Sequence, residues 1–328
     1  MMEKFEPKKF ISKKIQELRT QSGERKILVA VSGGLKSLVC FEIARNAKIK
    51  DQSQVIPLMI DTGMLRTTLD KNHNIPQTEV KQTEVYFKKR YDLTLDVWDE
   101  GEKFFAALKG IVDPVEKRKV FRDTFYRIMS QALRSYSADV LVVGTTISDI
   151  IETQKGIKIH FNVLHEAGIN PMMYGLQVSE PLKELTRTRV KMIAKILGIP
   201  KKYLSTQPFP GPGFAIRIIG EVTREKIEKI RMATNIVESE LKNPRLSQCF
   251  PVLLADKVIG IQNDTGFIGD TIALRIVETS KDSLEAKPYK LSWVKIEKIV
   301  RRIINEVPGV VRVVYDVTPK PPGTIEFV

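Results

Sequence analysis

The sequence predicts an α/β fold: a doubly wound parallel sheet followed by a smaller C-terminal α+β domain. Apolar, β-rich segments alternate with amphipathic helical segments over residues 1–206. Several of the apolar segments end in loops that contain Gly, Ser or Asp, and residues 207–213 (QPFPGPG) then interrupt the alternation. Such alternation forms a parallel sheet with helices on both faces, and a Pro- and Gly-rich stretch marks a junction. We therefore expect domains at 1–206 and 207–328.

The elements of the first domain follow from apolar periodicity. The expected strands are Lys26–Val31, Val55–Ile60, Leu93–Trp98, Asp139–Val143 and Leu176–Ser179. The expected helices are Leu35–Ala47, Thr78–Tyr91, Pro114–Ser135 and Glu184–Leu197. Apolar residues at helical spacing predict the last of these, and Gly198 with Pro200 ends it. Residues 156–175 are expected to form a long loop, and long loops in compact domains are commonly lids or binding loops.

The second domain combines helices and strands in an order typical of α+β folds. The expected elements are a helix at Arg224–Leu241, strands around Val258–Gln262 and Thr271–Glu278, a helix at Trp293–Val307 and a strand at Arg312–Val317.

Composition excludes several classes of protein. Hydrophobic residues make up 42% of the 328 residues and charged residues 28%, which is typical of a globular protein. The apolar runs are too short to span a bilayer, and residues 1–14 lack the apolar segment of a signal peptide, so a cytoplasmic protein without membrane contact is expected. Cys40 and Cys249 have no Cys or His at metal-ligand spacing, which predicts two buried thiols.

The net charge of +14 favours anionic partners, such as nucleotides, pyrophosphate or RNA. A nucleic-acid partner is not expected from charge alone, because a chain rich in Lys and Glu is also typical of heat-adapted proteins.

The segment Ser32–Ser37 (SGGLKS) follows the first expected strand and opens a helix. Glycines let backbone N–H groups approach phosphate oxygens, and the N-terminus of a helix favours anions. The segment is not a Walker A loop, because Lys36 follows Leu35 rather than Gly and the upstream glycine is missing. Two further segments, 61–66 and 144–149, also follow strands, and ligands of such sheets bind beyond the carboxyl ends of the strands.

The loop resembles the SGGxDS pyrophosphate loop of the N-type ATP-pyrophosphatases, whose fold is of the adenine nucleotide alpha-hydrolase type. Later segments resemble the synthetase subunit of two-subunit GMP synthases, above all Pro208–Glu221 (PFPGPGFAIRIIGE), Thr271–Val277 (TIALRIV) and Asn305–Phe327, which contains KPPGTIE. The resemblance spans residue 8 to the C-terminal end.

The resemblance implies a ligase that adenylates xanthosine monophosphate (XMP) with ATP and Mg2+, releases pyrophosphate, and amidates the product with ammonia to give GMP and AMP. It implies that ATP or pyrophosphate is bound by Ser32, Gly33, Gly34, Leu35, Lys36, Ser37, Asp61 and Gly144, with Thr62 and Gly63 near the adenosine. It implies catalytic roles for Ser32, Ser37, Lys119, Lys158 and Asp149, with Lys117 and Arg118 as further cations and Asp149 as the magnesium ligand.

In the second domain, the resemblance implies XMP binding by Arg217, Lys320, Thr324, Ile325 and Glu326. A cation with hydroxyl and backbone donors can hold a nucleotide monophosphate. It also implies a homodimer through the second domain, with the segment Arg312–Val317 and the helix before it at the interface. Because the pyrophosphatase pattern starts near residue 8, a separate glutaminase subunit or free ammonia is expected as the nitrogen source.

The chain departs from the family pattern mainly at the ATP end. Lys36 stands where the family has Asp, Val143 where it has Gln and Ser148 where it has Pro; Ile159 and Phe161 replace Ser and His; Asn263 and Gly266 interrupt a Gly-Asp-x-Arg segment. Lys36 can attract pyrophosphate but cannot coordinate magnesium as a carboxylate does.

Three hypotheses follow. The first is the amidating ligase, the second a nucleotide-binding paralogue with impaired chemistry, and the third an RNA-modifying pyrophosphatase suggested by the basic charge. The two cysteines are poorly placed for a thiolating enzyme, and the KPPGTIE segment favours a mononucleotide over RNA. His73, His160 and His165 are the only histidines and lack the spacing of a Ser-His or Cys-His triad, so a hydrolase is not expected.

Overall fold

A computed structural model of the protein describes residues 5–69, 76–154, 170–241, 246–262, 264–279 and 285–327. The chain divides into two compact units. The first comprises 1–62, 80–100 and 121–206, and the second comprises 63–79, 101–120 and 207–328. The last change of unit, at Thr206 and Gln207, coincides with the expected junction, but two earlier segments also belong to the second unit. The domain boundaries 1–206 and 207–328 therefore stay a prediction.

The first unit contains a five-stranded sheet in which every pairing is parallel. Its strands are β1 (Lys26–Ala30), β2 (Val55–Asp61), β5 (Asp96–Asp99), β6 (Ala138–Val142) and β7 (Gln177–Ser179). The spatial order is β5-β2-β1-β6-β7, so the chain adds strands first on one side of β1 and then on the other. This is the predicted doubly wound sheet, and its strand order reverses between β1 and β6.

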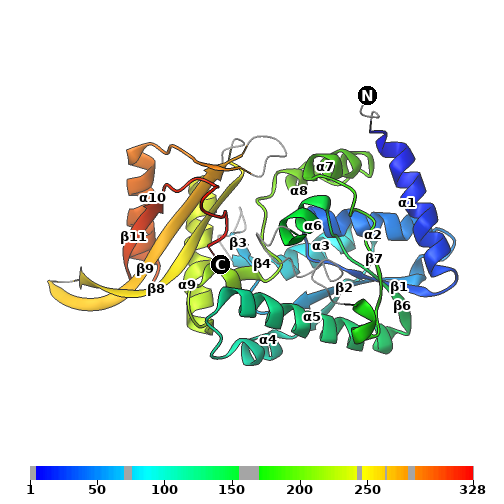
Figure 1. The fold of residues 1–328 in the computed structure, drawn as a ribbon, viewed down its shortest axis with the longest axis horizontal. Coiled ribbons are helices and arrows are strands. Elements are labelled where there is room, and N and C mark those ends of the chain that lie inside the picture. The colour runs from blue at the N-terminus through cyan, green and yellow to red at the C-terminus, as the bar shows by residue number, and fades with distance from the viewer. Residues whose placement is uncertain are drawn as a thin grey trace. The chain divides into compact units, whose positions relative to one another are not determined.

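Helices cover both faces of this sheet, with α1, α2 and α7 on one face and α5 on the other (Figure 1). The helices of this part of the chain are α1 (Pro7–Ser22), α2 (Leu35–Ala47), α3 (Glu79–Tyr91), α5 (Pro114–Tyr136), α6 (Ile147–Gln154), α7 (Arg187–Ile196) and α8 (Lys201–Ser205), with short 3₁₀ turns at η1 (Gln52–Gln54) and η2 (Pro171–Tyr174). The first residues of α3 and α5 belong to the second unit.

The centre of the sheet is buried on both faces. Ile27, Leu28 and Val29 of β1 are fully buried, as are the apolar side chains at 140–142 of β6. Strands covered by helices on both sides are continuous apolar runs rather than alternating ones, which is the pattern that made them predictable.

The first unit also contains helices that the sequence patterns did not predict. Helix α1 is charged overall, but it buries Ile11, Lys14 and Leu18 along one stripe, and Pro7 at its start and Gly23 after its end are ordinary boundary signals. Helix α6 follows the loop at 144–146, and the Asp149 carboxylate accepts from the backbone N–H of Thr146, which is one of the two bonds of a capping box. Both signals were present in the sequence.

The second unit is an α+β fold, as predicted. Its main sheet contains β8 (Gln248–Gln262), β9 (Thr265–Glu278), β10 (Lys287–Pro288) and β11 (Val310–Asp316). Strand β9 is central, because β8 and β10 pair with it in antiparallel and β11 in parallel orientation. Helix α9 (Arg224–Glu240) contacts β8, and α10 (Trp293–Glu306) contacts β11.

The remaining elements of this unit are helix α4 (Gly101–Leu108), the 3₁₀ turn η3 (Gly213–Arg217) and a hairpin of β3 (Thr67–Leu69) and β4 (Pro76–Thr78). Strands β8 and β9 are much longer than the expected Val258–Gln262 and Thr271–Glu278. Pro251 lies inside β8, opposite Leu274. Proline is rare inside strands, so the sequence pattern alone argued against a strand that continues through this position.

The two cysteines are free and buried, as predicted, and burial raises the pKa of each thiol to about 12. Within the described ranges of the chain, no helix is both long enough and apolar enough to cross a membrane.

Candidate active site

Two loops of the first unit meet where the strand order of the sheet reverses. The loop at 31–34 leaves β1 and leads into α2, and the loop at 143–146 leaves the adjacent strand β6 and leads into α6. Asp61, at the carboxyl end of β2, lies at the same edge of the sheet. Crevices at such reversal points are the usual ligand sites of doubly wound sheets. The fold therefore brings the predicted segments 32–37 and 144–149, and Asp61 at the start of the segment 61–66, to one edge of the sheet.

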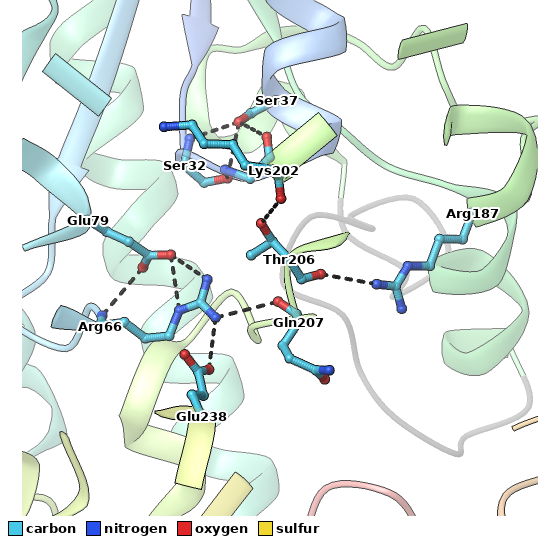
Figure 2. A network of polar contacts seen from close by, with 10 residues as sticks. Ser32, Ser37, Arg66, Glu79, Arg187, Lys202, Thr206, Gln207 and Glu238 are labelled. Carbon is cyan, nitrogen blue, oxygen red and sulfur yellow. Dashed lines mark hydrogen bonds and ion pairs between the residues drawn. The ribbon is translucent and has the colours of Figure 1, made fainter. Parts of the chain in front are cut away.

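Two serines brace the loop after β1. The hydroxyl of Ser37 accepts hydrogen bonds from the backbone N–H (3.1 Å) and the hydroxyl (3.2 Å) of Ser32, and it donates to the carbonyl of Gly34 at 2.9 Å (Figure 2). Gly34 is the N-cap residue of α2, and as a glycine it provides no side-chain cap for this end of the helix. A helix N-terminus without a side-chain cap suits an anion, because its first N–H groups need acceptors.

Two glycines allow the close packing of this site. Gly33 has a φ of +71°, and a Cβ built there would lie 2.6 Å from the hydroxyl oxygen of Thr83. A Cβ built on Gly144 would lie 2.9 Å from the Cβ of Lys36 and 3.2 Å from its backbone carbonyl carbon. The loop after β6 therefore packs directly on the first turn of α2, which only glycine permits.

An ion pair joins the two loops. The Lys36 ammonium lies 2.7 Å from Oδ2 of Asp149, with 44% of the lysine side chain exposed and 9% of the aspartate side chain. The same oxygen accepts hydrogen bonds from the backbone N–H and the hydroxyl of Thr146, both at 2.9 Å. Hydrogen bonds from Thr146, just before α6, therefore hold the Asp149 carboxylate, which faces the Lys36 ammonium.

Lys36 and Asp149, as they are arranged, do not fit a magnesium ion bound directly by the protein. Magnesium in proteins is usually bound through one or two carboxylates with open oxygens. Oδ2 of Asp149 already has three donors, and position 36 offers an ammonium group. Among the described residues, no group of three or more His, Cys, Asp or Glu side chains could hold a metal.

The predicted cations at 117–119 differ strongly in environment. Lys117 is fully buried and donates to the carbonyl of Ile218 at 2.7 Å, and burial, together with the charge of Lys226, lowers its pKa to about 8. Arg118 is also buried, whereas Lys119 is half exposed and lies 3.7 Å from Glu116. Lys117 is thus a structural contact inside the second unit. Lys158 and most of the expected loop at 156–175 lie outside the described residues, and the described end of that loop contains η2.

Arg217, in the second unit, is buried among aromatic rings. Its side chain is 2% exposed, and its guanidinium lies 4.2 Å from the ring centre of Phe250 and 5.0 Å from that of Phe209. Gly213 begins the 3₁₀ turn that ends at Arg217, and only glycine fits there, because a Cβ would lie 2.3 Å from the carbonyl oxygen of Met64. Burial lowers the pKa of Arg217, and the charge of Glu326 partly offsets this.

The contact between Arg217 and Glu326 is incomplete. Nε of Arg217 and Oε2 of Glu326 lie 3.7 Å apart, and within the described chain neither buried atom has a hydrogen-bond partner. Unsatisfied buried polar atoms are costly and uncommon in native proteins. This pair is therefore a candidate for contact with a polar ligand.

Arg275 anchors the C-terminal segment, a role that the sequence analysis missed. This fully buried side chain of β9 donates to the carbonyls of Thr318 (2.5 Å), Thr324 (2.7 Å) and Ile325 (3.3 Å). It also pairs with Asp316 at 3.0 Å. A charged residue inside the apolar run TIALRIV was the available signal, because a buried charge needs partners.

The other predicted XMP residues lie on the anchored segment. The backbone of Lys320 pairs with Ala286, the side chain of Ile325 packs on the apolar cluster that contains Phe250, and the Thr324 hydroxyl bonds to the carbonyl of Glu326. The structure thus brings the predicted residues of this segment together on one unit, and their roles as XMP ligands stay predictions.

A second buried arginine was also missed. Arg66 binds Glu79 through Nε (3.1 Å) and Nη2 (2.6 Å), and its Nη1 contacts Glu238 and the carbonyl of Gln207 (Figure 2). Burial lowers its pKa, but the charges of Glu79 and Glu238 outweigh this, so the pKa is raised. This network ties the segment after β2 to the segment that leads towards Arg217.

Two family models match the chain in the same order as its sequence motifs. Residues 7–200 match the PP-loop domain, and residues 234–327 match the GMP synthase C terminal domain. The first match contains both loops at the sheet reversal, and the second contains Arg275 and the C-terminal segment.

Similar proteins match along nearly the whole chain. The B subunit of the glutamine-hydrolysing GMP synthase of Archaeoglobus fulgidus is 41% identical over 97% of this chain and 98% of its own. The proteins of the same name from Pyrococcus furiosus and Methanopyrus kandleri are 40% and 39% identical, over 97% and 98% of this chain and 97% and 99% of their own. The chain therefore belongs to the family of these GMP synthase B subunits, which combines a PP-loop domain with a GMP synthase C-terminal domain.

Proposed function

We propose that this chain is the synthetase subunit of a GMP synthase, a ligase that forms a C–N bond with the energy of ATP. The C2 oxygen of XMP attacks the α-phosphorus of ATP, and the bond to pyrophosphate breaks. Ammonia then attacks C2, and AMP leaves with the oxygen that it gained. The observation that carries the proposal is the loop after β1, with a glycine at the N-cap of α2, two hydroxyls and one ammonium, in a chain of this family.

The loop supplies what the first step needs. Negative charge grows on the pyrophosphate as it leaves, and fixed donors aimed at that charge stabilise the transition state. We propose that the N–H groups at 33–37, the hydroxyls of Ser32 and Ser37 and the Lys36 ammonium hold the pyrophosphate. Asp61 and Gly144 border the ATP site, and Lys119 and Lys158 supply further positive charge.

XMP binding is assigned to the second unit. The buried Arg217 and Glu326, with unsatisfied polar atoms, and Lys320, Thr324 and Ile325 on the anchored segment support this assignment. Arg217 would give its guanidinium N–H groups to the nucleotide. Hydrogen bonds to a bound nucleotide would offset the free-energy cost of burying these polar groups.

Ammonia and subunit partners complete the proposal. The relatives' name describes a glutamine-hydrolysing enzyme made of more than one kind of subunit, so we propose that a separate glutaminase subunit delivers ammonia to this chain. Mg2+ as the companion of ATP and a cytoplasmic location are also part of the proposal, because both fit an enzyme that consumes nucleotides.

We also propose a homodimer through the second unit. Trp293 and Val294 at the start of α10 are 73% and 76% exposed, and Val314 of β11 is 40% exposed, so this surface offers apolar area for a second copy. Light scattering should give twice the mass of one chain. A monomer mass at micromolar concentration would contradict the dimer.

The enzymatic proposal is tested by incubating the full chain with XMP, ATP, Mg2+ and ammonium while measuring GMP and pyrophosphate. Equal amounts of both products, dependent on XMP, are expected. An Arg217→Met variant should lose activity chiefly through a raised KM for XMP. If the parent releases no pyrophosphate with XMP present, the proposal is wrong, and thermal stabilisation by ATP or XMP would then favour the nucleotide-binding paralogue.

A further inference from the structure

Lys36 is an unusual residue for the position it occupies. It is the second residue of α2, and the first turn of this helix contains no acidic residue. The N-terminus of a helix carries partial positive charge, so a cation there is unfavourable unless an anion neutralises it. Asp149 supplies one such anion at 2.7 Å, across the reversal point of the sheet.

The geometry of this pair leaves Lys36 able to change partners while Asp149 stays in place. Asp149 is buried and bound twice by Thr146, which fixes its position in the first turn of α6. Lys36 is 44% exposed and attached through a flexible four-carbon side chain. Its ammonium has three donors, so it can contact Asp149 and an incoming phosphate oxygen at the same time.

We propose that Lys36, aimed by Asp149, is a direct pyrophosphate ligand, and that its ammonium takes the place of a divalent cation held by loop carboxylates. This inference rests on the proposed function, because it concerns the loop assigned to pyrophosphate. The consequence is that pyrophosphate binds to this loop without Mg2+. The positive charge comes from the chain itself, and Asp149 orients it instead of holding a metal ion.

The experiment is isothermal titration of the full chain with inorganic pyrophosphate, once in EDTA and once with Mg2+. The parent should bind in EDTA with an affinity within about tenfold of that in Mg2+. Lys36→Met should weaken binding in EDTA by roughly tenfold or more, as expected when a hydrogen bond between charged groups is lost. Lys36→Arg should keep most of the affinity, because it keeps the charge.

Two controls separate a specific contact from general attraction to a basic protein. Lys50→Met removes the same charge from an exposed position just beyond the other end of α2, and it should bind pyrophosphate as the parent does. The double variant Lys36→Met with Asp149→Asn keeps the net charge of the parent and leaves no buried carboxylate without its partner. It should still lose binding in EDTA, and circular dichroism would verify that it folds.

Two outcomes would overturn the inference. One is a parent that binds pyrophosphate only with Mg2+ and loses that binding in Asp149→Asn, which would make Asp149 a metal ligand. The other is Lys36→Met binding in EDTA as tightly as Lys50→Met. Failure of the proposed function is distinguishable, because pyrophosphate binding needs no XMP: a chain that binds pyrophosphate through Lys36 but makes no GMP refutes only the ligase.

Discussion

Lys36 at the loop after β1 in the first unit and Arg275 of β9 in the second unit are both cations paired with a carboxylate, but their surroundings are opposite. At the loop, Lys36 is half exposed, and among the residues that the structure describes its carboxylate partner is Asp149. In the second unit, Arg275 is fully buried and has three carbonyls and Asp316 as partners. A cation with many buried partners stabilises the fold, whereas one with a single partner at the surface can turn to a ligand.

Arg217 is intermediate between these two. It is as buried as Arg275, yet its Nε has no hydrogen-bond partner within the described chain and lies 3.7 Å from Glu326. Burial alone therefore does not distinguish a cation that stabilises the fold from one that binds a ligand. The number of satisfied hydrogen-bond donors distinguishes them, and variants at each position test this distinction.

The largest effect is expected for Arg275→Met. The substitution leaves Asp316 without its partner and three carbonyls without a donor, and removal of one member of a buried ion pair costs about 3–5 kcal/mol. Urea unfolding should show this loss of free energy of unfolding. Lys287→Met, at an exposed position of β10, which also pairs with β9, is the control and should change stability by less than about 0.5 kcal/mol. Equal, small changes in both variants would contradict a structural role for Arg275.

The second prediction concerns Arg217 and Glu326 together. The double variant Arg217→Met with Glu326→Gln removes two buried charges with little change in volume, so stability should stay close to that of the parent. XMP affinity should fall by roughly tenfold to a hundredfold, as expected for the loss of a hydrogen bond to a charged group. Titration calorimetry with XMP measures this, and unchanged affinity would remove Arg217 from the XMP site.

The third prediction is a pH dependence from Lys117. Burial lowers its pKa in the folded protein to about 8, from the ordinary value of 10.5 that the unfolded chain has. Between pH 8 and pH 10.5 the unfolded chain binds more protons than the folded protein, so the contribution of Lys117 to the free energy of unfolding rises with pH. Below pH 8 the full cost of burying the charged Lys117 side chain remains. Relative to Lys117→Met, the parent should gain on the order of 2 kcal/mol of unfolding free energy from pH 8 to pH 10. If the unfolding free energies of parent and variant differ by the same amount at both pH values, the lowered pKa of Lys117 is contradicted.

The smallest effect is expected for Gly144→Ala. The new methyl group would meet the Cβ and backbone of Lys36 below normal contact distance, so the loop after β6 must move away from α2. Overpacking of this kind should cost on the order of 1 kcal/mol of stability and lengthen the contact between Lys36 and Asp149. Thermal unfolding checks this, with Gly266→Ala, where the nearest atom is the carbonyl oxygen of Gly260 at 4.0 Å, as the control for a glycine-to-alanine change without overpacking. An unchanged melting temperature in Gly144→Ala would show that the loops do not need this close contact.

The sequence predicted the parts of this account that depend on local pattern. Buried parallel strands are apolar runs, and a Ser-Gly-Gly turn between strand and helix is a local motif, so the sheet and the turn from β1 to α2 were predictable. The helix α6 was missed although its capping box, Thr146 to Asp149, is visible in the sequence. Nothing local pairs Lys36 with Asp149, because they are 113 residues apart and meet only through the order of the sheet.

The same reason explains the missed arginines. Arg275 could be recognised as a buried charge that needs partners, but besides Asp316 its partners are backbone carbonyls at 318–325, which have no sequence signature. Arg66 gains its contacts from Glu79 and Glu238, which are separated by 13 and 172 residues from it. Backbone acceptors and distant carboxylates become visible only in the folded chain.

The most direct test of the central claim follows the oxygen atom of XMP. XMP labelled with heavy oxygen at C2 is incubated with the chain, ATP, Mg2+ and ammonium, and the products are analysed by mass spectrometry. Adenylation of XMP predicts that the heavy oxygen appears in the phosphate of AMP and is lost from GMP. Unlabelled AMP formed together with GMP would contradict adenylation at this oxygen, and the absence of both products would contradict the ligase itself.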